Sequence, residues 1–246
     1  ESLLRPDPHA GPDGRYCVRS VYFDDPEDGC MAENEDGTDP RAKYRLRIYN
    51  ASDARISLER KAKLLYEQAT KNQMVQLKET RIICAYAFAV SEQNADNGTI
   101  VTAPTCGSCG VLPAVLRYMQ EDHGYSDEKI LHALAVGGII GNLIKHNASV
   151  SGAECGCQAE VGAACAMASA ALAELCDMTL DQIEFAAEIA LEHHLGLTCD
   201  PICGLVQIPC IERNAVAAMR AINAVRIANF LTATRKISFD MVVETM

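Results

Sequence analysis

The sequence predicts a mainly α protein in which a short, incomplete β-rich segment precedes a larger helical domain. Of its 246 residues, 49% are apolar and only 5% are aromatic, and alanine is abundant after residue 80. That composition favours closely packed helices. In the same part, apolar residues recur at helical spacing between Ser, Thr and Gly residues that suit helix ends. The first quarter instead contains short runs of alternating apolar and polar residues, which are typical of strands.

Charge and hydropathy exclude several classes of partner. The net charge of −11 argues against nucleic acid. The longest apolar stretches, residues 130–144 and 163–176, are too short and too interrupted to span a membrane. No secretory leader is visible, and the twelve cysteines lie mostly in alanine-rich sequence. We therefore expect a cytoplasmic protein with reduced thiols. Because the first residue is not Met, we also expect a fragment of a longer chain.

The β-rich segment is predicted over residues 1–66, and the helical domain over residues 67–246. Strands are expected at residues 15–23, 43–49 and 56–61. The second of these runs alternates strictly, so Lys43, Arg45 and Arg47 share one face.

Seven helices are predicted in the larger domain. Ser126 has the position of a helix cap, and Thr179 with Gln182 has the spacing of a capping box. The expected helices cover residues 72–94, 112–123, 126–145, 152–176, 179–194 and 212–231, with a last one starting at Ser238. Three loops between them carry unusual chemistry, at residues 103–110, 146–157 and 196–210.

Cysteines are concentrated in these three loops. They are Cys106 and Cys109 in the first, Cys155 and Cys157 in the second, and Cys199, Cys203 and Cys210 in the third. Thiolates that converge from separate loops hold zinc or iron–sulfur clusters. The C-x-x-C pair in the first loop is also compatible with a redox dithiol. The remaining cysteines of the helical domain, in apolar helix sequence, are interpreted as buried structural thiols.

Four long motifs carry a family resemblance. They read APTCGSCG at 103–110, NASVSGAECGCQ at 147–158, EHHLGLTCDP at 192–201 and GLVQIPCIERN at 204–214. With them, residues from about 76 to 246 resemble the alpha chain of bacterial iron–sulfur-dependent L-serine dehydratases. The resemblance implies a [4Fe-4S] cluster held by Cys157, Cys199 and Cys210. Cys155 and Cys203 are then local variation.

The resemblance also implies a reaction. Three thiolates leave one iron of a cubane open, and that iron acts as a Lewis acid on the hydroxyl of L-serine. The products are pyruvate and ammonia. In the family, a beta domain or beta chain completes the active site, so a separate beta chain is the expected partner. The C-terminal motif usually continues beyond this chain's last residue, so we also expect a lost tail.

Two polar segments are candidates for substrate contact. Asn147, Ser149 and Ser151 are the catalytic candidates. Thr105, Gly107, Ser108 and Lys145 are the substrate-binding candidates, since a small-residue loop lets backbone N–H groups approach an anion. The structural alternative is a tight turn at the first segment and a helix end followed by a cap at the second.

A second resemblance covers the start of the chain. With VRSVYFD at 18–24, RAKYRLRIY at 41–49 and ISLERK at 56–61, residues 16–63 resemble part of a VTC-type polyphosphate polymerase domain. This implies phosphate contacts from the basic face and a metal ligand at Glu59. A closed tunnel needs about eight strands, so we expect no polymerase activity. Two partial families that meet near residues 63–76 indicate a chimera.

Other functions stay open at this point. The chain could be a desulfidase that acts on cysteine, an inactive cluster- or zinc-binding remnant, or a polyphosphate-binding protein. A disulfide-stapled secreted protein is disfavoured by the composition. Alanine-rich helix faces pack either within one chain or between chains, which leaves a homo-oligomer open.

Overall fold

A computed structural model describes most of the helical domain and two strands before it. The described residues are 18–23, 44–49, 66–67, 75–95, 98–199, 209–231 and 235–246. The chain divides into two compact units, residues 1–57 and residues 58–246.

The first unit contains one antiparallel pair of strands. Strand β1 (Val18–Phe23) pairs with β2 (Tyr44–Tyr49), with Val18 opposite Tyr49 and Phe23 opposite Tyr44. Two of the three predicted strands are thus confirmed. The third, at residues 56–61, lies outside the described residues, as do Lys43 and Glu59.

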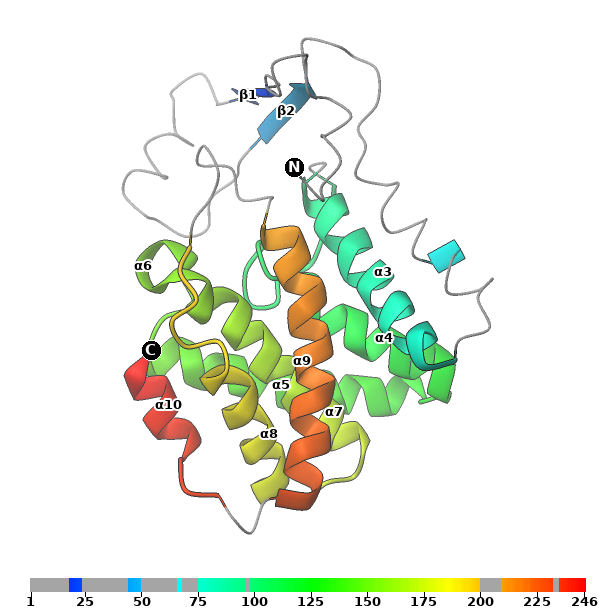
Figure 1. Cartoon of the computed structure of the whole chain (residues 1–246), viewed down its shortest axis with the longest axis vertical. Coiled ribbons are helices and arrows are strands. Elements are labelled where there is room, and N and C mark those ends of the chain that lie inside the picture. The colour runs from blue at the N-terminus through cyan, green and yellow to red at the C-terminus, as the bar shows by residue number, and fades with distance from the viewer. Residues whose placement is uncertain are drawn as a thin grey trace, which may run out of the picture. The chain divides into compact units, whose positions relative to one another are not determined.

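The second unit is helical (Figure 1), so the predicted mainly α class is confirmed. Its elements are α3 (Val75–Ala95), α4 (Val111–His123), α5 (Asp127–Asn147), α6 (Gly152–Cys157), the π-helix η1 (Gln158–Gly162), α7 (Ala163–Leu175), α8 (Leu180–Glu192), α9 (Cys210–Leu231) and α10 (Phe239–Thr245). None of the described helices has the length and apolar character needed to cross a membrane.

Side-chain caps start three of these helices where the sequence predicts them. The Ser126 hydroxyl accepts from the backbone N–H of Lys129 at 3.4 Å. Thr179 and Gln182 form both bonds of a capping box. Ser238 accepts from the backbone N–H of Met241 at 3.2 Å. Each cap satisfies a donor that the first helical turn leaves free, so the helix begins there.

Helix α7 forms the centre of the core. Every one of its side chains is buried except that of Glu174. It packs against α4, α5, α8 and α9. A helix that is apolar on all sides has to be buried on all sides. Because most of its side chains are alanine, its neighbours approach closely.

The approach of α5 to α7 depends on two glycines. A Cβ at Gly137 would lie 3.0 Å from the backbone oxygen of Met167, and a Cβ at Gly141 would lie 2.7 Å from the Met167 sulfur. Gly138, on the other side of the same helix, has no atom within 4 Å of a built Cβ. Gly137 and Gly141 therefore set the distance between the two helices.

The expectation of one continuous helix over residues 152–176 is wrong. The structure has three elements there, namely α6, η1 and α7. Gly156 takes φ +75° and ψ −175°, which is not helical, and the backbone resumes in the wider π-helix before α7 begins. A π-helix inserts an extra residue per turn, which turns the following side chains to new directions.

Replacing Gly137 by Val should destabilise the helical unit. The added side chain meets the backbone of α7, which cannot rotate away as a side chain can, and overpacking of this kind costs about 1–3 kcal/mol. Gly138→Val is the matched control on the same helix, and its stability should stay within about 0.5 kcal/mol of the wild type. Chemical denaturation of both variants measures the difference. Equal losses would show that α5 and α7 are not in close contact at Gly137.

Candidate functional site

Three cysteine side chains from separate segments meet in the helical unit. Cys157 ends α6 and is buried, Cys199 follows α8 and is half-buried, and Cys210 opens α9 and is buried. The thiols of Cys199 and Cys210 each hydrogen bond to the sulfur of Cys157. The structure therefore brings together the three cysteines named as ligands by the family resemblance, although other segments separate them in sequence.

A glycine allows the segment before Cys199 to reach Cys157. Gly156 has φ +75°, where an L side chain is strained, and a Cβ there would lie 2.9 Å from the Leu197 oxygen. The backbone N–H of Gln158 donates to that oxygen at 2.9 Å, and the Gln158 side chain accepts from the N–H of Gly196 at 2.8 Å. These bonds hold residues 196–199 against the end of α6.

An arginine stabilises negative charge on the central thiol. Arg213 donates to the Cys157 sulfur at 2.9 Å and to the Thr198 carbonyl at 3.0 Å. The hydrogen bond from Cys210, together with the charge and hydrogen bond of Arg213, lowers the pKa of Cys157 to about 6 against the opposing effect of burial. Burial and the neighbouring Cys157 raise the pKa of Cys199, and the hydrogen bond to Cys157 with burial raises that of Cys210. Arg213 and the neighbouring thiols thus favour the thiolate form of Cys157 over that of Cys199 and Cys210.

A buried carboxylate ties the C-x-x-C loop to this site. The Thr105 hydroxyl and the Gly107 backbone N–H both donate to Glu160, a residue of η1. Burial raises the pKa of Glu160, and these two bonds oppose that effect. A Cβ at Gly107 or at Gly152 would collide with the carboxylate. Both glycines are thus needed for the loop at 103–110 and the segment at 148–152 to close around Glu160.

A buried amide joins the same loop to α9. Asn214 accepts from the Gly110 N–H at 2.9 Å and donates to the carbonyls of Gly107 at 2.7 Å and Cys210 at 2.8 Å. Its side chain is fully buried. Asn214 therefore fixes the loop relative to the first turn of α9, which carries Cys210.

The donor set fits an iron–sulfur cluster. No three His, Cys, Asp or Glu side chains are arranged around the position of a single metal ion in the part of the chain that the structure describes. The three thiols are hydrogen bonded to one another beside a guanidinium. Thiolates from separate segments are the usual ligands of such clusters, and hydrogen bonds to their sulfurs tune them. Hard ions such as Mg²⁺ prefer oxygen ligands.

Comparison with protein families matches residues 29–246 to the serine dehydratase alpha chain. The chain belongs to this family. The matched range begins inside the first unit, and the resemblance of residues 16–63 to a polyphosphate polymerase domain stays a prediction.

Relatives of the chain are L-serine dehydratases from several bacteria. It is 53% identical over 165 residues to the L-serine dehydratase of Streptomyces coelicolor, covering 67% of this chain and 36% of that protein. It is 54% identical over 162 residues to L-serine dehydratase TdcG of Escherichia coli, covering 65% and 36%. For the Haemophilus influenzae L-serine dehydratase the identity is 48% over 195 residues, covering 78% and 43%. The chain thus spans little more than a third of the length of its first two relatives.

In this member of the serine dehydratase alpha chain family, the three catalytic candidates lie between the end of α5 and the start of α6. Asn147 is exposed at the end of α5, and its amide donates to the Leu143 carbonyl at 2.9 Å. Ser149 donates to the Glu154 carboxylate at 2.5 Å and accepts from the backbone N–H of Ser151 at 3.0 Å. Ser151 caps α6 without a side-chain bond and precedes Gly152, which lies against Glu160. Ser151 is therefore the candidate whose backbone lies nearest to Glu160.

The substrate-binding candidates divide into two groups. Thr105, Gly107 and Ser108 share the loop that Glu160 holds, and the buried Ser108 hydroxyl is within 3.1 Å of the Thr105 hydroxyl and donates to Ala103 at 3.4 Å. Lys145 is exposed on α5. The structure brings the loop residues to the site and leaves Lys145 on the surface.

Sequence reasoning missed three residues of this site, namely Glu160, Arg213 and Asn214. Glu160 carried one signal, because it is a lone acidic residue in the apolar stretch 159–173. A carboxylate in such a stretch is buried and needs partners. Arg213 and Asn214 belong to the quoted motif at 204–214, but nothing local indicates the distant loops that they contact.

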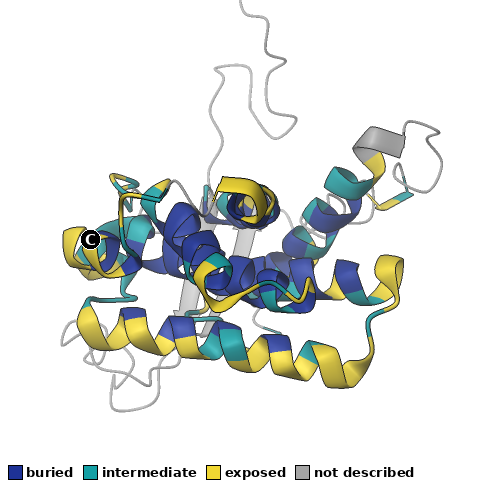
Figure 2. Cartoon of the chain, turned by 90° about the horizontal axis from the view of Figure 1, so that it is seen from below, coloured by how far each residue is buried: buried dark blue, intermediate teal, exposed yellow. Residues whose placement is uncertain are grey.

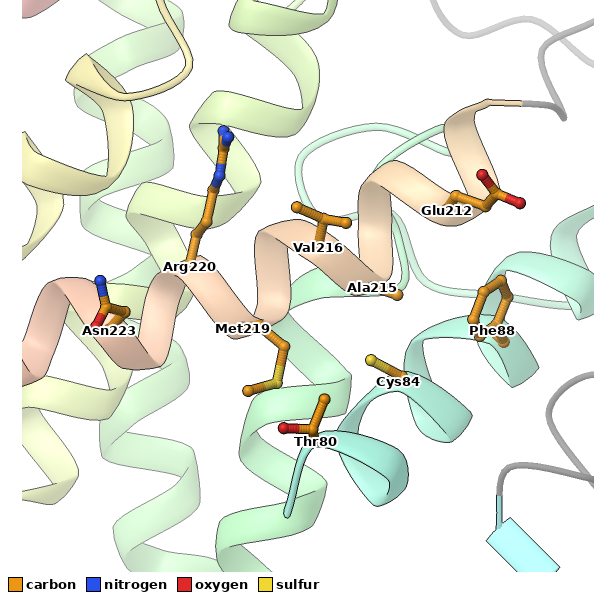
Figure 3. Close-up of a pocket in the computed structure, with 9 residues that line it drawn as sticks. All are labelled: Thr80, Cys84, Phe88, Glu212, Ala215, Val216, Met219, Arg220 and Asn223. Atoms are coloured by element: carbon orange, nitrogen blue, oxygen red, sulfur yellow. The ribbon is translucent and has the colours of Figure 1, made fainter. Parts of the chain in front are cut away.

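A groove lies on the face of α9 opposite to the face that carries Cys210 and Asn214. A cavity of about 490 Å³ opens between α3 and α9 (Figure 3). Its lining residues are Thr80, Cys84, Phe88, Glu212, Ala215, Val216, Met219, Arg220 and Asn223. By helical periodicity these α9 residues face away from Cys210 and Asn214. The groove is therefore separate from the three-thiol site.

Gly156→Ala should remove metal binding. The new methyl group meets the Leu197 carbonyl and pushes residues 197–199 away from Cys157. Gly124→Ala is the matched control, because Gly124 also has positive φ, at +72°, but no atom within 4 Å of a Cβ. Both variants should lose about 1–3 kcal/mol of stability from backbone strain. Only Gly156→Ala should lose bound iron after anaerobic reconstitution. Equal iron in the two variants would contradict the assigned role of Gly156.

Asn214→Ala should destabilise the chain by about 1–3 kcal/mol, because it leaves the buried N–H of Gly110 and the carbonyl of Gly107 without partners. Asn223→Ala, at an exposed position of the same helix, should change stability by less than about 0.5 kcal/mol. Thermal unfolding of the two variants compares them. If Asn214→Ala lost no more stability than Asn223→Ala, the hydrogen bonds of Asn214 to the loop at 103–110 would not contribute to stability.

Proposed function

We propose that this chain is the cluster-binding part of an iron–sulfur-dependent L-serine dehydratase. The observation that carries the proposal is the meeting of Cys157, Cys199 and Cys210 beside Arg213. Membership of the serine dehydratase alpha chain family supports the reaction, and the relatives, which are L-serine dehydratases, support L-serine as its substrate.

The three cysteines would hold a [4Fe-4S] cluster through their sulfur atoms. When bound, the cluster supplies a Lewis acid for the substrate hydroxyl, because one iron lacks a protein thiolate. Arg213 stabilises the thiolate form of Cys157, which is the form that ligates iron. The bonds of Gln158 and the close approach at Gly156 keep Cys199 in reach.

Residues around Glu160 would position the substrate. Glu160 and Asn214 fix the loop that carries Thr105, Gly107 and Ser108. Small residues in that loop let backbone N–H groups approach the substrate carboxylate. Ser149, Ser151 and Asn147 would contribute polar groups from the segment before α6, with Lys145 as a more distant positive charge. Loss of water from L-serine then gives aminoacrylate, which hydrolyses to pyruvate and ammonia.

The proton acceptor for the substrate Cα would come from a partner. The chain spans about 36% of the first two relatives, so their full activity involves residues that this chain does not match. We propose that a beta chain or beta domain completes the active site and supplies the general base. A cytoplasmic location would keep the thiols reduced.

Iron analysis of single-cysteine variants tests the proposal. After anaerobic purification and reconstitution, the wild type should bind about four irons with equal sulfide. Cys157→Ala, Cys199→Ala and Cys210→Ala should each lose the cluster absorption. Cys176→Ala, which changes an exposed thiol at the end of α7, is the matched control and should keep it. A folded wild-type chain without iron would contradict the proposed cofactor.

Turnover measurements separate the substrate from the cofactor. The iron-loaded chain, alone and with a beta chain added, is given L-serine, L-threonine or L-cysteine, and pyruvate, 2-oxobutyrate and sulfide are followed. Pyruvate from L-serine supports the dehydratase. Sulfide from L-cysteine at a higher rate would favour the desulfidase alternative. A cluster-loaded chain that stays inactive with every beta chain tried would support the alternative that the protein binds a cluster but is not an enzyme.

A further inference from the structure

Helix α5 exposes apolar surface that its own chain leaves uncovered in the described part. Leu131 is 64% exposed, Ile139 59%, Leu143 44% and Leu134 40%. Residues 130–144 contain no Asp, Glu, Lys or Arg. Figure 2 shows this helix along the lower edge, with its outer face exposed and its inner face against the core. Apolar surface of this kind on one helix marks a site of association.

The middle of the outer face has the pattern of a helix–helix contact. Leu131, Ala135, Gly138 and Asn142 follow one another at intervals of four, three and four residues, which places them in one stripe. The two central residues are small, so a second helix can approach closely. Asn142 is the one polar member of the stripe, and a single polar residue in such a position specifies register.

The two ends of α5 carry opposite charges. Asp127 and Glu128 lie in its first turn, and Lys145 and His146 in its last turn. Glu128 and Lys145 are both exposed, and neither forms an ion pair with any other residue that the structure describes. The helix is about 30 Å long, so these charges cannot reach one another within one copy.

An antiparallel arrangement of two copies accounts for the exposed apolar surface, the small-residue stripe and the opposite charges at the two ends of α5. The stripe is symmetric about the midpoint between Val136 and Gly137, so Ala135 of one helix meets Gly138 of the other, and Leu131 meets Asn142. Glu128 then lies opposite Lys145 of the second copy, and Asp127 opposite His146. The same surface serves both copies, as a two-fold axis requires.

We propose that the outer face of α5 is the interface of a homodimer in which two α5 helices pack antiparallel. The occupant of the apolar face is thus a second copy of this chain. The apolar stripe is buried between the copies, and the charged ends select the antiparallel direction over the parallel one, in which like charges would meet.

Sedimentation of the whole chain tests the dimer first. The wild type should sediment as a dimer, and Ala135→Glu should weaken self-association at least tenfold, because two carboxylates meet near the two-fold axis. Phe230→Glu is the matched control: it places the same charge on an exposed apolar position of α9 and should leave the dimer unchanged. Circular dichroism checks that each variant is folded, which the exposure of both positions favours. A monomeric wild type would overturn the proposal.

A charge exchange tests the direction of packing. Glu128→Lys and Lys145→Glu should each weaken the dimer, and the double variant should restore it, because the two new charges attract across the interface. Both substitutions oppose the helix dipole, so a more stable helix cannot explain the recovery. A double variant that stays as weak as the single ones would overturn the antiparallel register. A dimer that survives Ala135→Glu would place the interface elsewhere.

Discussion

Burial of α7 on every side is the constraint on which the helical unit depends. Its alanines remove little apolar area individually, so stability requires that many of them lose water together. The helices around it must therefore come close. Gly137 and Gly141 of α5 provide that approach on one side, and α8 and α9 pack on others. The positions of the surrounding helices follow from the small size of the side chains at the centre.

The candidate site is a consequence of this packing. The chain enters α7 through α6 and η1, and α8 and α9 both contact η1 as well as α7. Cys199 follows the end of α8, and Cys210 lies at the start of α9, so both arrive beside Cys157. Glu160, on η1, then joins the loop before α4 to the same place. One buried helix thus organises groups from four parts of the sequence.

The sequence predicts the elements well where a local signal marks an end. Ser126, Thr179 and Ser238 are caps in the structure as they are in the pattern. It fails at Gly156, because a run of small residues suits a continuous helix, and only the approach of Leu197 requires the break. The cysteine set came from a family resemblance. Glu160, Arg213 and Asn214 were missed because their partners are distant in sequence, and periodicity describes only neighbours.

Mössbauer spectroscopy of the chain loaded with isotopically enriched iron tests the central claim most directly. A cluster held by Cys157, Cys199 and Cys210 has three irons with a protein thiolate and one without. The account predicts two kinds of iron signal in a ratio of three to one, with the minor one changed by L-serine. Four equivalent irons, or a single iron bound by sulfur alone, would contradict it.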